Sequence, residues 1–205
     1  MRIILFFILS FISVQSHGQN LHNEAAQLIA AERYQDALPL LEKLITESPK
    51  NTIYVRNRAV AYIHLKQYSK GIKDLEYLKS NDPKDFEYPF LIGDAYEQMD
   101  SFKLAVKYYS TAIDIDKEDY NVFFKRGTCY LQLKDYPAAI ADFTQSLKNN
   151  EEHDNSYNNR GIAYYQSGHK EKACADWCKA SINGNSFSAA HLKKTCQSYS
   201  QFCKK

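Results

Sequence analysis

Small and bulky residues recur along the chain at a fixed spacing of 34 residues. Each period holds two small residues twelve apart, namely Ala25 and Ala37, Ala59 and Gly71, Gly93 and Ala105, Gly127 and Ala139, and Gly161 and Ala173. Bulky residues follow the first small residue by three positions and the second by four, at Leu28, Tyr62, Tyr96, Tyr130 and Tyr164, and at Leu41, Leu75, Tyr109, Phe143 and Trp177. Spacings of three and four place side chains on one face of a helix. Each period therefore predicts two helices whose small residues allow them to pack closely.

This pattern resembles the tetratricopeptide repeat, a helix–turn–helix unit of 34 residues. The match is clearest at Phe123, Gly127, Tyr130, Ala139 and Phe143, and at Tyr157, Gly161, Tyr164, Ala173, Trp177 and Ala180. The family's closing proline is present at Pro49 and Pro83 and absent from the last three periods. The resemblance implies an all-α, right-handed α-solenoid of five repeats with a C-terminal capping helix. The repeats would span 18–51, 52–85, 86–119, 120–153 and 154–187, within a domain over 19–185.

An arginine and an aspartate occur together, sixteen residues apart, in three of the five repeats. The pairs are Arg58 with Asp74, Arg126 with Asp142, and Arg160 with Asp176, and repeats one and three lack both members. Joint presence and absence predicts contact between the two helices of a repeat. We therefore expect three salt bridges within repeats. The alternative is a row of arginines that binds anions, but an aspartate beside each arginine would neutralise it.

The first eighteen residues have the organisation of a secretory signal peptide. Arg2 precedes an apolar run over 3–14, and small residues Ser16 and Gly18 stand at minus three and minus one of a cleavage site. The run is short for a transmembrane helix, and no cysteine near the site would accept a lipid. We expect cleavage after Gly18 and a periplasmic or secreted product; the alternative is an uncleaved N-terminal anchor.

Four of the five cysteines lie in the last 32 residues. Gly184 and Asn185 predict a helix stop, and Ser186 or Ser188 would cap a further helix over about residues 188–198, covering the exposed end of the last repeat. Cys174 and Cys196 are each eleven residues from Asn185, so an antiparallel pair of helices brings them together. In an exported protein this predicts a disulfide between them.

The other cysteines leave alternatives open. Cys178 is a candidate partner for Cys203, and isolated Cys129 is expected to be a buried apolar residue. Zinc is the alternative to the disulfide, with Cys174, Cys178, His191 and Cys196 as its ligands. Because His191 and Cys196 are five apart in a predicted helix, they would point away from a common site. We therefore expect neither a metal nor a cofactor.

The resemblance also implies where a partner binds, because the first helices of tetratricopeptide repeats line a concave groove. The candidate partner-binding residues are Arg56, His64, Glu87, Phe90, Asp94, Glu97, Asn121, Phe124, Asn158 and Tyr165. The repeat does not need the aromatic residues in this set for its own packing, so they are candidate anchors for a partner. Alternatively, they pack against neighbouring helices. Acidic residues at 87, 94 and 97 favour a partner with some positive charge.

The sequence contains no set of residues typical of a catalytic site. It lacks a G-x-S-x-G segment, a P-loop and an H-E-x-x-H segment. The net charge of +2 gives no electrostatic case for nucleic acid. We expect a non-enzymatic adaptor that binds a protein or peptide and is a monomer or weak dimer. The alternatives are a chaperone-like protein that holds clients, and a zinc-binding or thiol-active protein.

Overall fold

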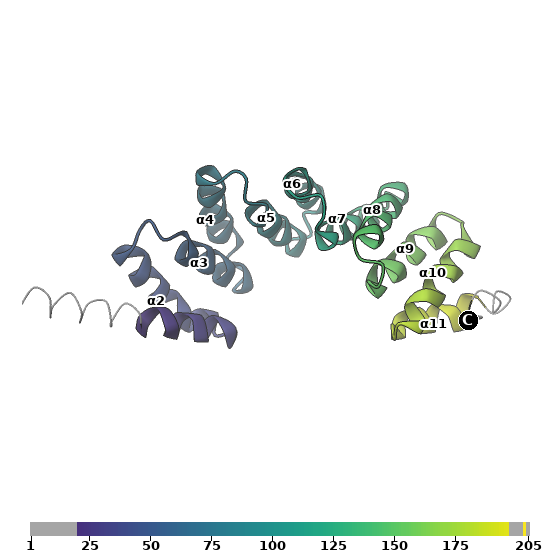
Figure 1. The fold of residues 1–205 in the computed structure, drawn as a ribbon, viewed down its shortest axis with the longest axis horizontal. Helices are drawn as coiled ribbons and strands as arrows, with labels where there is room; N and C mark the ends of the chain where they lie inside the picture. The colour runs from purple at the N-terminus through teal and green to yellow at the C-terminus, as the bar shows by residue number, and fades with distance from the viewer. Residues whose placement is uncertain (1–19, 197–202, 204–205) are drawn as a thin grey trace, which may run out of the picture. The chain divides into compact units, whose positions relative to one another are not determined.

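The computed structural model describes residues 20–196 and residue 203. The chain divides into two compact units, Met1–Lys84 and Asp85–Lys205, called unit 1 and unit 2 below. In unit 1, residues 20–30 are helical. The labelled helices of this unit are α2 (Tyr34–Glu47), α3 (Thr52–His64) and α4 (Tyr68–Asn81), shown in Figure 1.

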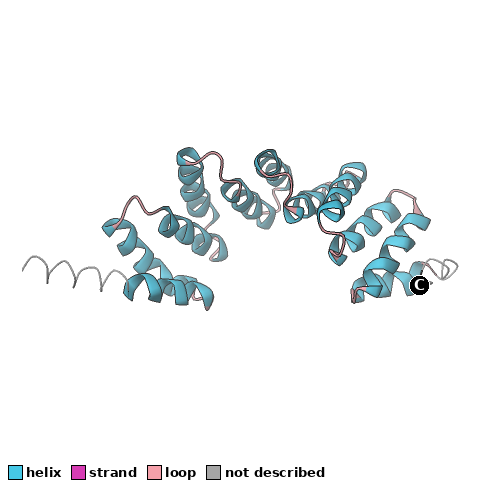
Figure 2. Ribbon diagram, in the orientation of Figure 1, coloured by secondary structure: helices cyan, strands magenta, loops and turns pink. Residues whose placement is uncertain are grey.

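Unit 2 contains three helix pairs followed by one further helix. The pairs are α5 (Glu87–Gln98) with α6 (Phe102–Ile115), α7 (Tyr120–Gln132) with α8 (Tyr136–Asn149), and α9 (Asp154–Gln166) with α10 (Lys170–Ile182). Helix α11 (Ser186–Thr195) packs on α10. Figure 2 shows only helices and loops in the described part of the chain. The predicted all-α architecture of helix–turn–helix repeats with a capping helix is confirmed.

The turn inside each repeat reverses the chain by the same hydrogen bond. A backbone amide donates to the carbonyl five residues earlier in all five repeats. The donor and acceptor pairs are Arg33 and Leu28, Gln67 and Tyr62, Ser101 and Tyr96, Asp135 and Tyr130, and His169 and Tyr164. The residue before each donor has a positive φ, as a helix end of this type requires. Glycine fills that position only at Gly168, so these turns do not stand out in the sequence.

The glycines at the first small position make room for a ring from the second helix of the same repeat. A Cβ on Gly127 would lie 2.9 Å from the Phe143 ring, and one on Gly161 would lie 2.6 Å from the Trp177 indole. Gly93 has the same relation to Tyr109. Tyr109, Phe143 and Trp177 are at most 1% exposed. The small residue and the aromatic residue sixteen positions later are therefore one packing unit.

Replacing Gly127 with alanine should destabilise the chain although alanine is the better helix former. The gain in helix propensity is about 1 kcal/mol, whereas forcing a methyl group into this packed contact costs about 1 to 3 kcal/mol. Urea unfolding of Gly127→Ala and of Gly127→Ala with Phe143→Leu measures the balance. Gly127→Ala should lower the free energy of unfolding less when Phe143 is already leucine than when Phe143 is kept, the first effect being measured against Phe143→Leu alone. Equal losses in both backgrounds would show that the ring does not restrict this position.

The three predicted salt bridges are present, each formed by two hydrogen bonds. Arg126 Nε and Nη2 donate to Asp142 at 2.7 Å, and Arg58 and Arg160 bind Asp74 and Asp176 at 2.8–2.9 Å. The third nitrogen of Arg126 donates to Ser110 on α6 of the preceding repeat at 2.9 Å. These arginines therefore hold the two helices of one repeat together, and Arg126 also joins successive repeats.

The C-terminal cysteines lie in the expected pairs. Cys174 and Cys196 are at disulfide-bonding distance with Cα atoms 5.8 Å apart, and Cys178 and Cys203 form a second pair. The start of the capping helix differs from the expectation. Asn185, rather than a serine, is the N-cap, because its side chain accepts from the Ser188 amide at 2.9 Å. The helix therefore begins at Ser186. The proposed signal peptide lies outside the described residues.

Candidate functional site

Nine of the ten candidate partner-binding residues retain some exposure on the first helices of their repeats. In unit 1, Arg56 and His64 lie on α3, and the His64 ring stacks on Tyr34 at 4.3 Å. The other candidates lie in unit 2, with Glu87, Phe90, Asp94 and Glu97 on α5, Asn121 and Phe124 on α7, and Asn158 and Tyr165 on α9. The exception is Asn158, which is buried.

Asp94 and Glu97 belong to a hydrogen-bonded network that the sequence did not reveal. The Tyr109 hydroxyl, from α6, lies 2.6 Å from Asp94 Oδ1 and 2.7 Å from Glu97 Oε2. The Lys125 ammonium, from α7, lies 3.1 Å from the same two oxygens. The two carboxylates therefore join three helices, and one positive charge partly neutralises them.

The electrostatics of this network keep the Tyr109 hydroxyl and the Lys125 ammonium protonated. Burial and the two carboxylates raise the pKa of Tyr109, so its hydroxyl stays protonated. Burial of Lys125 disfavours its charge, but Asp94 and Glu97 outweigh that effect and raise its pKa. Two carboxylates against one ammonium leave a net negative charge. The negative charge of this acidic centre is therefore smaller than its acidic residues alone suggest, because Lys125 is its counter-ion.

The three candidate aromatic anchors all contact the large ring of their own repeat. Phe90 lies 5.8 Å from the Tyr109 ring, Phe124 lies 6.0 Å from Phe143, and Tyr165 lies 5.8 Å from Trp177. Phe90 and Phe124 are partly buried, as the packing alternative holds, whereas Tyr165 is 38% exposed. Tyr165 is thus the aromatic residue of the set that is best placed to contact a partner.

Phe124 also touches the histidine that immediately precedes α9. The His153 ring meets Phe124 edge-on at 4.8 Å, and its Nδ1 lies 2.7 Å from the Ser156 hydroxyl. Burial lowers the pKa of His153, although Asp154 opposes this. Phe124 and His153 therefore form part of the packing between α7 and the start of α9.

Asn158 must be removed from the candidate set because α11 covers it. It is 8% exposed, and its Oδ1 accepts a 2.8 Å hydrogen bond from the Ser188 hydroxyl. Its carbonyl oxygen accepts from the Trp177 indole at 3.2 Å. Asn158 thus holds the capping helix on the last repeat. Its burial could not be read from the repeat pattern, because no other first helix is followed by this cap.

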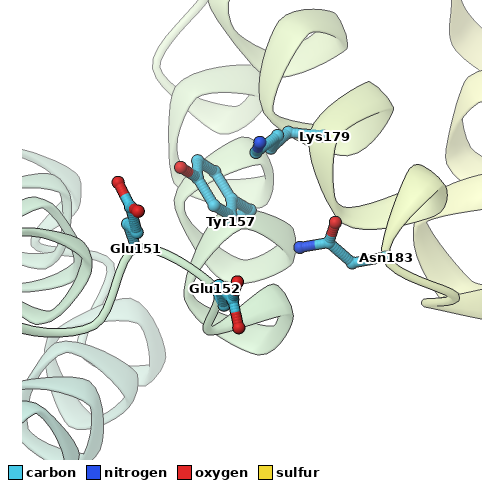
Figure 3. A pocket seen from close by; sticks show the side chains of 5 residues that line it. All are labelled: Glu151, Glu152, Tyr157, Lys179 and Asn183. Atoms are coloured by element: carbon cyan, nitrogen blue, oxygen red, sulfur yellow. The ribbon is translucent and has the colours of Figure 1, made fainter.

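A separate hollow of about 490 Å³ lies where the α8–α9 loop faces α10. Glu151 and Glu152 come from the loop, Tyr157 from α9, and Lys179 and Asn183 from the end of α10, as Figure 3 shows. None of the ten candidate residues lines it. Its polar lining carries both signs of charge.

The described residues also show what chemistry is absent from them. Across residues 20–196 and 203, no group of three or more histidine, cysteine, aspartate or glutamate side chains is arranged to hold a metal ion. The proposed zinc ligands are otherwise engaged, since their cysteines are paired and His191 stacks on Trp177 at 4.6 Å. Burial raises the pKa of the Cys129 thiol to about 12, which makes it a poor nucleophile. Within the same residues, no helix combines the length and apolar character needed to cross a membrane.

Solved structures with the same fold include several with low sequence identity. A structure described as MamA residues 41 to the end, from Desulfovibrio magneticus RS-1, has a TM-score of 0.73 and 13% identity, over 81% of this chain and 94% of that one. YrrB, described as a TPR protein with an unusual peptide-binding site, has a TM-score of 0.69 and 20% identity, over 84% and 89% of the two chains. At these identities the similarity concerns the fold. No curated protein matches the chain in sequence.

Family models match almost the whole described region. One model described as tetratricopeptide repeat matches residues 28–89, and a second model with the same description matches residues 90–147 and 124–189. These matches agree with the helix pairs, with the repeated turn and with the glycine–aromatic contacts described above. The chain therefore belongs to the tetratricopeptide repeat family.

Proposed function

We propose that this chain is a non-enzymatic adaptor that acts outside the cytoplasm and binds a peptide or protein on the first helices of unit 2. The family is a protein-interaction fold, and repeat arrays offer an extended surface for binding. The observation that carries the proposal is the network of Asp94, Glu97, Tyr109 and Lys125 on α5, α6 and α7. It fixes a polar centre on a surface that also bears the exposed ring of Tyr165.

The polar centre gives the surface a preference for particular partners. Its residual negative charge, with Glu87 on the same helix, favours a segment that carries a basic side chain. Tyr165 supplies an aromatic contact of the kind that anchors protein interfaces. A segment that carries both a basic and an apolar side chain is therefore the partner chemistry that we expect. Location outside the cytoplasm rests on the signal-like residues 1–18.

Crosslinking in the native host, followed by purification of the tagged chain and mass spectrometry, tests the proposal. One dominant partner should be recovered, and Tyr165→Ser combined with Asn121→Ala should reduce its recovery about tenfold. These positions are better probes than Phe90 and Phe124, whose rings also support the fold. The same measurement identifies the first residue of the isolated chain, which should be Gln19.

Two other results would count against the proposal. The matched control is Lys148→Ser on α8, whose exposed side chain lies on a second helix. If the control loses the partner as strongly as the surface variant does, the surface is wrongly assigned. Recovery of many unrelated exported proteins would support the chaperone-like alternative.

A further inference from the structure

Positive charge is concentrated at the C-terminal end of unit 2. Residues 177–205 contain five lysines and neither aspartate nor glutamate. By contrast, residues 85–159 contain fourteen acidic and seven basic residues. The overall charge of +2 conceals this asymmetry. An end of a chain with one sign of charge attracts a partner of the opposite sign.

The same end exposes large apolar side chains. Ile182, the last residue of α10, is 54% exposed, and Phe187, in the first turn of α11, is 74% exposed. Six residues of α11 are exposed. Five of them are called the cap face here, namely Phe187, Ala189, Ala190, Lys193 and Lys194, and the sixth is Ser186. A helix that only shields the end of a repeat array needs a polar outer face. The cap face instead combines an aromatic ring, two small apolar residues and two lysines.

The inner side of α11 is held firmly, so the cap face has a fixed orientation on unit 2. Ser188 is fully buried and donates to Asn158, and Leu192 packs with Trp177 and Cys196. The pairing of Cys174 with Cys196 ties the end of α11 to the middle of α10. Cys203 is paired with Cys178, which lies on the same helix α10.

We propose that the cap face binds an anionic lipid surface, independently of the partner surface on the first helices. Phe187 enters the boundary between headgroups and acyl chains, while Lys193 and Lys194 contact lipid phosphates. A lysine can lay its apolar stem along that boundary and keep its ammonium at the phosphates. A lipid surface accommodates a protruding ring without a matching pocket, which favours lipid over an acidic protein as the occupant.

Vesicle co-sedimentation tests this assignment with the chain as isolated from cells. The vesicles contain either phosphatidylcholine alone or equal parts of phosphatidylcholine and phosphatidylglycerol. The chain should bind the second kind, and added salt should weaken the binding. Lys193→Glu combined with Lys194→Glu should lower partitioning by about tenfold or more, and Phe187→Ser by about tenfold. All variants keep the same N-terminus, so any contribution of residues 1–19 cancels.

The control is Lys103→Glu combined with Lys148→Glu, an equal change of charge on exposed lysines of α6 and α8. Circular dichroism checks that every variant keeps its helices. The proposal is overturned if the control loses as much binding as the cap variants, or if the unaltered chain ignores phosphatidylglycerol. A third outcome is tight binding to poly-glutamate without partitioning onto vesicles. If Phe187→Ser leaves that binding unchanged, the cap face binds an acidic protein instead of lipid.

Discussion

Replacing Arg126 with alanine is expected to lower the free energy of unfolding of unit 2 by about 3 to 5 kcal/mol. The side chain of its partner, Asp142, is 7% exposed, and both of its oxygens accept from the guanidinium. Burial raises the pKa of Asp142 above its usual value, and the hydrogen bonds and charge of Arg126 offset only part of that effect. Without Arg126, a buried carboxyl group would lose its counter-ion and Ser110 would lose its donor. Urea unfolding followed by circular dichroism measures the loss.

A double-mutant cycle distinguishes the pair from its two separate residues. Arg126→Leu with Asp142→Leu should be much less destabilising than Arg126→Leu alone, because no buried charge remains. The exposed pair of Arg33 and Asp36, with side chains 63% and 52% exposed, is the matched control. Arg33→Ala should cost less than about 1 kcal/mol, since solvent screens that pair. Additive effects of the Arg126 and Asp142 changes would contradict the proposed coupling.

The features predicted correctly from the sequence are those that the chain repeats. Arg126 and Asp142 were paired because two other repeats carry the same residues and two repeats lack both members. The internal copies thus supplied a comparison like that between related sequences. The pairing of Cys174 with Cys196 followed from their symmetric distance to the turn at Gly184 and Asn185. In both cases the residue spacing along the sequence predicts that the two side chains lie close together, because the geometry of an α-helix is fixed.

The features that could not be predicted occur only once. Lys125 meets Asp94 and Glu97 across two repeats, and the corresponding positions in the neighbouring repeats hold Leu91 and Asn159. No internal copy of this contact exists to reveal it. Asn158 was assigned to the partner surface by its repeat position, yet α11 buries it. The contacts of a capping helix depend on which repeat is the last one. The 34-residue spacing of the repeats does not reveal which residues that helix buries.

Replacing Trp177 with alanine should destabilise the end of unit 2 by about 3 to 5 kcal/mol, the range for a large aromatic residue lost from a core. Trp177 is 1% exposed and packs with Ala173, Cys174 and Cys196. Its indole nitrogen donates to the Asn158 carbonyl, and its ring stacks on His191 of α11. Loss of the Trp177 side chain would therefore leave a cavity and weaken the packing of the capping helix α11 on α10. Hydrogen exchange read by mass spectrometry should show faster exchange in α9, α10 and α11.

A graded series separates the lost volume from the lost hydrogen bond. Trp177→Phe keeps a ring against Gly161 but removes the indole N–H donor. It should destabilise the chain by about 1 to 3 kcal/mol relative to the native residue, which is less than the cost of Trp177→Ala. Tyr77→Ala, at a ring that is 54% exposed on α4 of unit 1, should change stability by less than about 0.5 kcal/mol. If Trp177→Ala accelerated exchange no more than Tyr77→Ala did, the Cys174–Cys196 pair and the Ser188–Asn158 hydrogen bond would hold α11 in place without the Trp177 ring. The ring would then contribute volume without anchoring the cap.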